Sequence, residues 1–473
     1  MKRLTGWDSF LLYSEAPNVH MHTLKIAVVE LVDPGALPLG VAEFRQVIRG
    51  RLYKLHPMRY ELVNIPFKLH HPMWRENCEV DLDYHVRRVT LPAPGGRREL
   101  DEAIGKIASV PLDRRHPLWE MYFIDGLADG RIAVVNKIHH ALADGVAAAN
   151  LLALGMDLQT DANADRDYEA DPAPTKGQLL RSAFRDHLRL LARVPSTIMY
   201  TVAGINRVRR SDRKLSPELT RPFTPPPSFM NHVLTPERMF ATATLSMADI
   251  KETKNALGVS INDLVLALSA GALRKMSLRY DGHANHPLLA SVPVSFDFSS
   301  ERISGNYFTG VMMPIPIHLD DPMDRVRQAH EDAILAKESN HLIGPELVSR
   351  WSNYLPPAGI EALFKRLSMM DGQNKVLNLN ISNVPGPREY GRVGGALVTE
   401  IYSVGPITAG SGLNITVWSY VDQLNISVLS DIDSVGDPHE VTQAMLDEFV
   451  EIRRAAGLSG QLTVVEKALP QAV

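Results

Sequence analysis

The amino-acid sequence predicts an α/β or α+β protein built from two lobes. Runs typical of β-strands alternate with segments of helical periodicity along the whole chain, which is the pattern of a mixed fold. The chain has 473 residues, 45% of them hydrophobic, and this length exceeds what one hydrophobic core usually serves. Residues 157–171 are acidic and loosely patterned and lead into Pro172, as a linker does. We therefore expect an N-terminal lobe over residues 1–170, a connecting region over 171–235 and a C-terminal lobe over 236–473.

The first lobe is predicted to alternate strands and helices. Residues 23–32 (TLKIAVVELV) have strand composition and are followed by the turn signal Asp33-Pro34-Gly35. The further predicted elements are, in order, a helix over 41–53, a strand over 83–91, a helix through Leu100, Ile104 and Ile107, a strand pair over 121–124 and 132–138, and a helix that begins near Asp144.

The second lobe continues the same alternation after the proline-rich residues 222–227. The predicted elements are, in order, a strand over 239–245, helices over 250–257 and 262–274, strands over 288–294 and 311–317, a helix over 322–337, strands over 376–381, 413–419 and 424–428, and a closing helix over 440–454.

The connecting region contains a basic amphipathic stretch over residues 179–194. Its apolar side chains recur at helical spacing, and its basic side chains form a parallel stripe: Leu180, Phe184, Leu188 and Leu191, and Arg181, Arg185, Arg189 and Arg193. Residues 176–221 hold 11 basic and 3 acidic residues, a local net charge of +8. One interpretation is a helix on an anionic membrane or lipid-droplet surface. The other is a crossover helix whose leucines are buried against protein.

The overall composition excludes several classes of protein. The formal net charge is −4, so nothing indicates a nucleic-acid partner. Cys78 is the only cysteine, which excludes an internal disulfide and a multi-cysteine metal site. The N-terminus has no apolar segment of signal-peptide type, and apolar runs such as 264–273 are too short to span a bilayer. We expect a cytoplasmic protein, in peripheral contact with the inner membrane or lipid droplets if the first interpretation of the basic stretch holds.

Chemistry is indicated by the stretch KIHHALADG, residues 137–145, where His139 and His140 precede Asp144 and Gly145. The pair stands where a predicted strand ends, so the two side chains should point to opposite faces. Metal ligation would need further ligands from elsewhere. A Ser–His–Asp relay would need a nucleophilic serine, and no G-x-S-x-G occurs. Direct general-base catalysis needs only one histidine near neutral pKa, and a purely structural pair remains the alternative.

A second histidine pair lacks this continuation. His70 and His71 lead into Pro72, which disfavours a helix at His71. We interpret this pair as structural.

The motif and its companions resemble the bacterial wax ester synthase/acyl-CoA:diacylglycerol acyltransferases, a family of the HHxxxDG CoA-dependent acyltransferase superfamily. The resemblance covers nearly the whole chain in colinear order. It is carried by HHALADG at 139–145, PLWE at 117–120, DLDYHVR at 81–87, NDLVLA at 262–267, Gly305-Asn306, AKE at 336–338, SNVPGP at 382–387 and LNIT at 413–416.

The resemblance implies a two-lobed chloramphenicol-acetyltransferase-like fold, each lobe a β-sheet flanked by helices, with the site and a tunnel between the lobes. It implies transfer of a long fatty acyl group from acyl-CoA to diacylglycerol or a fatty alcohol without an acyl-enzyme. His140 would be the general base, His139 would mostly help to place it, Asp144 would have a structural role in the turn, and Gly145 would relieve strain or crowding there. Substrate contacts would come from the motif residues Asn262, Asp263, Ser382 and Asn383. No cofactor or metal is implied, and acyl-CoA is a co-substrate.

The sequence departs from the family pattern at three places. The usual Pro-Val-Ser-x-Arg ends here in Asp297, Leu-Tyr after SNVPGP is replaced by Gly391-Arg392, and Met-His-Val-Gly becomes Met21-His22-Thr23-Leu24. These departures concern the acceptor and the tunnel wall, not the proposed base. The rival interpretations are a condensation-type or polyketide-associated acyltransferase, and a catalytically idle protein that binds lipid droplets.

Overall fold

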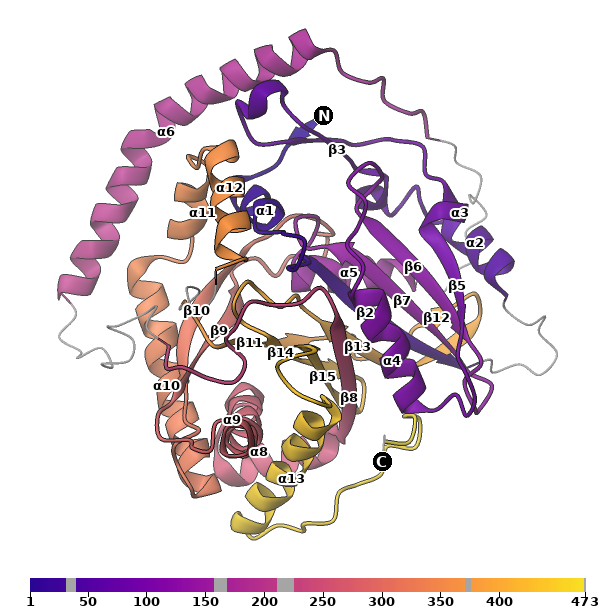
Figure 1. Ribbon diagram of the computed structural model, residues 1–473, viewed down its shortest axis with the longest axis vertical. Coiled ribbons are helices and arrows are strands. Elements are labelled where there is room, and N and C mark those ends of the chain that lie inside the picture. The colour runs from indigo at the N-terminus through magenta and orange to yellow at the C-terminus, as the bar shows by residue number, and fades with distance from the viewer. Residues whose placement is uncertain (31–39, 157–167, 211–224, 371–375, 472–473) are drawn as a thin grey trace.

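A computed structural model describes residues 1–30, 40–156, 168–210, 225–370 and 376–471 of the chain. It contains two six-stranded sheets and a small three-stranded one, with helices around them (Figure 1). The predicted turn at 33–35, most of the predicted linker at 157–171 and the first half of the proline-rich segment at 222–227 lie outside these residues.

The first sheet carries the histidine motif at the end of a central strand. Its order is β12 (Arg392–Val393), β13 (Ala396–Val404), β2 (His22–Glu30), β7 (Ile132–His139), β6 (Trp119–Asp125) and β5 (Val86–Thr90). Only the β5–β6 pair is parallel. The faces are covered by α2 (Val41–Arg49) and α5 (Gly145–Gly155) on one side and by α4 (Arg97–Ala108) on the other.

The second sheet forms the core of the other lobe. Its order is β10 (Phe308–Ile315), β9 (Leu288–Ser295), β11 (Leu379–Pro385), β14 (Leu413–Tyr420), β15 (Gln423–Asp431) and β8 (Arg238–Ser246). The helices packed with it are α8 (Met247–Leu257), α9 (Ile261–Tyr280), α10 (Pro322–Ile343) and α13 (His439–Ala455). The helix α9 is buried over most of its length, which explains its nearly continuous apolar sequence.

The remaining elements lie outside the two large sheets. The long helix α6 (Lys176–Arg210) runs along the outer edge of the molecule (Figure 1) and contacts α10 and α11. The other elements are β1 (Lys2–Arg3), α1 (Gly6–Tyr13), the 3-10 helices η1 (His56–Arg59) and η2 (Pro66–Lys68), β3 (Glu61–Val63), β4 (Met73–Arg75), α3 (Leu82–His85), α11 (Leu347–Ser352) and α12 (Pro357–Leu367).

Two local predictions differ from the structure. The predicted strand over 83–91 starts later, because the Asp81 side chain accepts hydrogen bonds from the amides of Asp83 and Tyr84 and caps the short helix α3 before β5 begins. No element was predicted for β13, although it lies next to β2 in the first sheet. The first sheet therefore takes strands from both sides of the boundary expected at residue 236.

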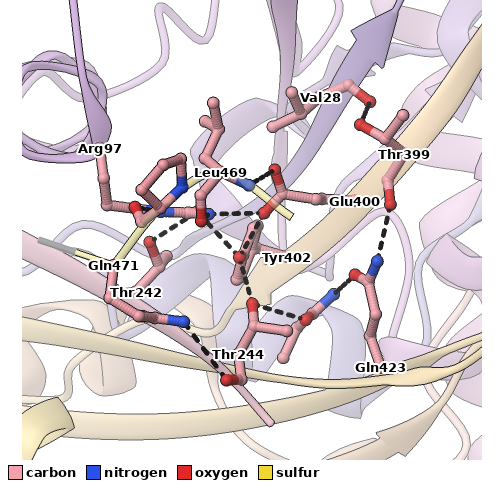
Figure 2. A network of polar contacts seen from close by, with 12 residues as sticks. Val28, Arg97, Thr242, Thr244, Thr399, Glu400, Tyr402, Gln423, Leu469 and Gln471 are labelled. Atoms are coloured by element: carbon pink, nitrogen blue, oxygen red, sulfur yellow. Dashed lines mark hydrogen bonds and ion pairs between the residues drawn. The ribbon is translucent and has the colours of Figure 1, made fainter. Parts of the chain in front are cut away.

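A buried ion pair explains how β13 holds a carboxylate in mid-strand. Arg97 on α4 donates to Glu400 on β13 at 2.7 Å, and both side chains are almost fully buried. Arg97 also donates to Tyr402 and to the carbonyl of Leu469, and Glu400 accepts from the Leu469 amide. Figure 2 shows this network continuing to Thr244 on β8. It joins the first sheet, the second sheet and the C-terminal segment.

In the part of the chain that the structure describes, no single helix is both long and apolar enough to cross a bilayer. The adjoining helices α8 and α9 reach that length and composition only as a pair, with a bend of 98° between them.

Candidate active site

A cavity of about 330 Å³ lies between the two sheets and includes the histidine motif. Both lobes contribute to its wall, and its polar and apolar groups are mixed. Its lining residues are Thr23, Lys25, His140, Asp144, Gly145, Val146, Asn262, Val292, Pro293, Val294, Ser295, Phe298, Phe308, Val311, Met313, Lys337, Ser382, Asn383, Val384, Pro385, Ser403, Gly405 and Thr416.

The two motif histidines point to opposite sides of the sheet, as their place at the end of β7 predicts. His140 lines the cavity, with its ring 5.5 Å from that of Phe308. His139 is fully buried away from the cavity. Its Nδ1 accepts a hydrogen bond from the Ala141 amide at 3.0 Å, and its Nε2 lies 3.8 Å from the Glu15 carboxylate. His139 therefore shapes the turn behind the site.

The tautomer of His140 is fixed by Asn306. The Asn306 side-chain amide Nδ2 donates to Asp8 Oδ1 and to the His140 carbonyl, both at 2.8 Å. Its Oδ1 therefore faces His140 Nδ1, 3.1 Å away, and accepts the proton that this nitrogen carries. The other ring nitrogen, Nε2, is left without a proton. This is the arrangement that a general base requires.

Burial lowers the pKa of His140 below its usual value of 6.5, and the nearby Lys25 charge lowers this pKa further, against the opposing effect of Asp144. The imidazole is therefore neutral at neutral pH. A neutral ring with a free Nε2 can accept a proton from a hydroxyl group in the cavity.

Asp144 joins the motif to the second lobe. Its carboxylate accepts from the Ala147 amide at 2.9 Å, which caps α5, and from the Tyr307 amide at 2.8 Å. Arg302 lies 3.0 Å from the same carboxylate, and Asp144 is almost fully buried. Both carboxylate oxygens of Asp144 are therefore engaged by groups that hold the motif turn against the second lobe.

Gly145 and three of the four predicted substrate contacts line the cavity. A Cβ on Gly145 would lie 3.3 Å from the Val384 side chain of β11, so the glycine permits the close approach of the two lobes. Asn262 lines the cavity from the first turn of α9, and Ser382 and Asn383 line it from β11.

Asp263 does not line the cavity. Its carboxylate accepts from the Ser260 amide at 2.9 Å, which closes a capping box at the start of α9, and from His330 at 2.8 Å. The structure therefore places Asp263 in the support of α9, behind Asn262.

Two family models match the chain. A wax ester synthase/diacylglycerol acyltransferase catalytic domain matches residues 4–265, and the corresponding C-terminal domain matches residues 304–453. The chain belongs to the wax ester synthase/diacylglycerol acyltransferase family. It is an acyltransferase. A Mycobacterium tuberculosis protein provisionally named as a diacylglycerol O-acyltransferase is 69% identical over 472 residues, covering 100% of each chain.

Solved structures confirm the fold of this acyltransferase. The wax ester synthase/diacylglycerol acyltransferase of Marinobacter aquaeolei VT8 has a TM-score of 0.68 at 24% identity, over 97% of this chain and 100% of that chain. A trichothecene 15-O-acetyltransferase of Fusarium sporotrichioides has a TM-score of 0.61 at 11% identity, over 95% of each chain. The predicted two-lobed chloramphenicol-acetyltransferase-like architecture is thus confirmed.

Two residues of the acyltransferase site were missed by the sequence analysis. Asn306 belongs to the Gly305-Asn306 pair that carried part of the resemblance, but nothing in the local sequence indicates that it reaches His140. Lys25 lines the cavity from β2 and directly follows the Met21-His22-Thr23-Leu24 departure. The sequence signal that could have identified Lys25 is its charge within an otherwise largely apolar strand.

The other departures from the family pattern have local structural partners. Arg302 lies 3.4 Å from Asp297 while it also pairs with Asp144, so the acidic residue meets a cation. Gly391 donates its amide to the Tyr420 hydroxyl, and a Cβ there would approach the sulfur of Met156 to 3.0 Å. The second histidine pair, His70 and His71, is buried outside the cavity and bonded to its surroundings.

Proposed function

We propose that this acyltransferase transfers a long-chain fatty acyl group from acyl-CoA to diacylglycerol, to a fatty alcohol, or to both. The observation that carries the proposal is His140, a neutral imidazole with its Nδ1 proton held by Asn306 and its Nε2 free, in the wall of a cavity between two lobes. The family and the names of its relatives supply the substrate class.

In the proposed reaction the acceptor hydroxyl gives its proton to His140 Nε2 as its oxygen attacks the thioester carbonyl carbon. The tetrahedral intermediate then collapses with breakage of the C–S bond. The leaving thiolate takes the proton back from the imidazolium, giving an ester and free CoA. No acyl-enzyme and no cofactor are needed, and a positioned base of this kind typically contributes about 10²–10⁴-fold in rate.

The developing oxyanion needs a hydrogen-bond donor, and Asn262 is the proposed one. It lies in the first turn of α9, where the positive end of the helix dipole adds to the field of the side-chain amide. Ser382 and Asn383 line the same cavity from β11 and are proposed as further polar contacts for the substrates. Asp144 and Gly145 would act indirectly, by holding the motif turn against the second lobe.

A peripheral membrane site is a second part of the proposal, because the substrates are apolar. The helix α6 exposes a stripe of large apolar side chains, among them Phe184 at 67% and Leu191 at 66% exposure. The crossover interpretation required these side chains to be buried. The residues that α6 does bury lie on another face of the helix: Leu179, Ala183, Thr197 and Gly204. Arginines beside the exposed stripe suit anionic headgroups.

The activity is tested with palmitoyl-CoA and either dioleoylglycerol or hexadecanol, with CoA release and ester formation measured together. We expect ester formation with at least one acceptor and its loss in His140→Ala. If the folded protein released no CoA when either acceptor was supplied, the result would support the idle lipid-binding alternative. Ester formation that survived in His140→Ala at the wild-type rate would exclude the proposed base.

A further inference from the structure

Lys25 is a buried cation in the wall of the catalytic cavity. It lies in the middle of β2, across from Asn136 on β7 and Ser403 on β13, and its side chain is 3% exposed. Its Nζ donates to Ser403 Oγ at 2.7 Å and lies 5.4 Å from the centre of the Trp418 ring. These two contacts fix the position of the Lys25 ammonium group.

The charge of Lys25 is not balanced by a carboxylate. Among the described residues none of the ion pairs includes Lys25, and the nearby Asp144 is engaged by Arg302 at 3.0 Å. An ammonium group has three N–H donors, and Ser403 takes one of them. Burial of a polar group without hydrogen-bond partners costs free energy, so such a group normally has partners, and in a substrate cavity the substrate can supply one.

The ligand must bring an oxygen atom to Lys25 that the reaction itself does not already use. In the proposed reaction the acceptor hydroxyl contacts His140, and the thioester carbonyl contacts Asn262. A fatty alcohol has no other oxygen, so its methylenes would lie against the Lys25 amine. Diacylglycerol carries ester carbonyls within a few bonds of its free hydroxyl and can supply an acceptor.

We propose that Lys25 is a specificity-determining residue that donates a hydrogen bond to an ester carbonyl of the acceptor and so favours diacylglycerol over a fatty alcohol. This inference rests on the proposed function. Burial also lowers the pKa of Lys25 to about 7, so the group changes between ammonium and amine near neutral pH. Both forms can donate to a carbonyl oxygen.

Two other roles of Lys25 would affect both acceptors alike. It could bind an amide carbonyl of the CoA arm, or its charge could act on His140 alone. Either role changes the acyl-CoA half of the reaction or the base, which are common to every acceptor. The ratio of kcat/KM for dioleoylglycerol to kcat/KM for hexadecanol cancels these effects, so this ratio reports on acceptor recognition.

The experiment measures this ratio in wild type, Lys25→Met and Lys25→Gln at saturating palmitoyl-CoA. Methionine fills a similar volume without a donor, and we expect the ratio to fall by about tenfold or more, the size of one unpaired buried donor. Glutamine keeps an N–H donor without the charge and should retain part of the preference. Circular dichroism establishes that both variants are folded.

Lys251→Met is the matched control. Lys251 lies on α8, is exposed to solvent and does not line the cavity, so its replacement should leave the acceptor ratio unchanged. Equal losses with both acceptors in Lys25→Met would overturn the inference and assign Lys25 to acyl-CoA or to His140. If the wild-type protein turned over neither acceptor, the result would instead overturn the proposed function, and the inference with it.

Discussion

Asn306 Oδ1 lies 3.1 Å from His140 Nδ1, and the two residues come from different lobes, 166 positions apart in the chain. Through this contact the second lobe determines which ring nitrogen of His140, the proposed base on the first lobe, carries the proton. Because Asn306 also binds the His140 carbonyl and Asp8, its amide can adopt only one orientation. In the proposed reaction, the packing of the second lobe against the first therefore sets the tautomer of the base.

Replacement of Asn306 should impair catalysis through the tautomer of His140. We expect Asn306→Ala to lower kcat by roughly 10–100-fold, since a misoriented imidazole loses part of the general-base contribution. In Asn306→Asp a carboxylate would face Nδ1 and raise the pKa of His140. Protonated His140 cannot act as a base, so the acidic limb of the kcat/KM–pH profile should move to higher pH. A lower rate with no movement of this limb would contradict the assigned contact.

The two motif histidines should differ in the kind of damage that their loss causes. We expect His140→Ala to lower kcat by about 10²–10⁴-fold, equivalent to ~3–5 kcal/mol, with little change in thermal stability. His139→Ala should retain more activity and lose stability instead, because a fully buried ring against Glu15 is replaced by a void. Steady-state kinetics and thermal unfolding of both variants check this division. A large loss of kcat in His139→Ala together with a loss of stability in His140→Ala would make His139 the base and His140 the structural residue.

Much of the first half of the site could be predicted from the sequence because its signals are local. Alternation along residues 132–138 places the histidines at a strand end on opposite faces, and Asp144 has the spacing of a helix cap. Asn306 carries no such signal, because its role depends on where the second lobe docks. In the same way β13 contains Glu400, whose place in a core strand depends on Arg97, 303 positions away.

Removal of the Asp144 carboxylate should destabilise the fold. In Asp144→Ala the buried Arg302 loses its close partner and the Tyr307 amide loses its acceptor, so we expect the free energy of unfolding to fall by about 3 kcal/mol. Asp297→Ala is the control, since Asp297 touches the same arginine but is 35% exposed and should cost much less. Chemical denaturation measures both. If both variants lost the same free energy of unfolding, the contacts of Arg302 rather than the Asp144 carboxylate would stabilise this part of the site.

Lys25→Met should stabilise the protein, most strongly at low and neutral pH. Burial lowers the pKa of Lys25 from 10.5 to about 7 in the folded state. Between these values the unfolded chain binds more protons than the folded one, so wild-type stability rises with pH across this window. Below about pH 7 both states are protonated and the full cost of burying the charge is present. The stabilisation by Lys25→Met, measured by denaturation, should therefore be a few kcal/mol at pH 6 and shrink towards pH 10. A gain independent of pH would indicate apolar packing alone.

The exposed face of α6 should bind anionic membranes. We expect the wild type to sediment with vesicles that contain anionic lipid and less with purely zwitterionic ones. Reversal of Arg181, Arg185, Arg189 and Arg193 to Glu should abolish the preference for anionic vesicles, because it replaces attraction to the headgroups by repulsion. Replacement of Phe184, Leu188 and Leu191 by Ser should weaken binding to both kinds of vesicle, because it removes the inserted apolar surface.

The control for the charge reversal alters the same number of exposed arginines elsewhere. Suitable positions outside α6 are Arg88, Arg98, Arg115 and Arg327. Their reversal to Glu changes the net charge of the protein by the same amount and should leave most of the vesicle binding in place. If this control lost binding as completely as the α6 variant, the attraction would depend on total charge rather than on α6. Binding that survived the α6 reversal unchanged would exclude the helix as the membrane contact.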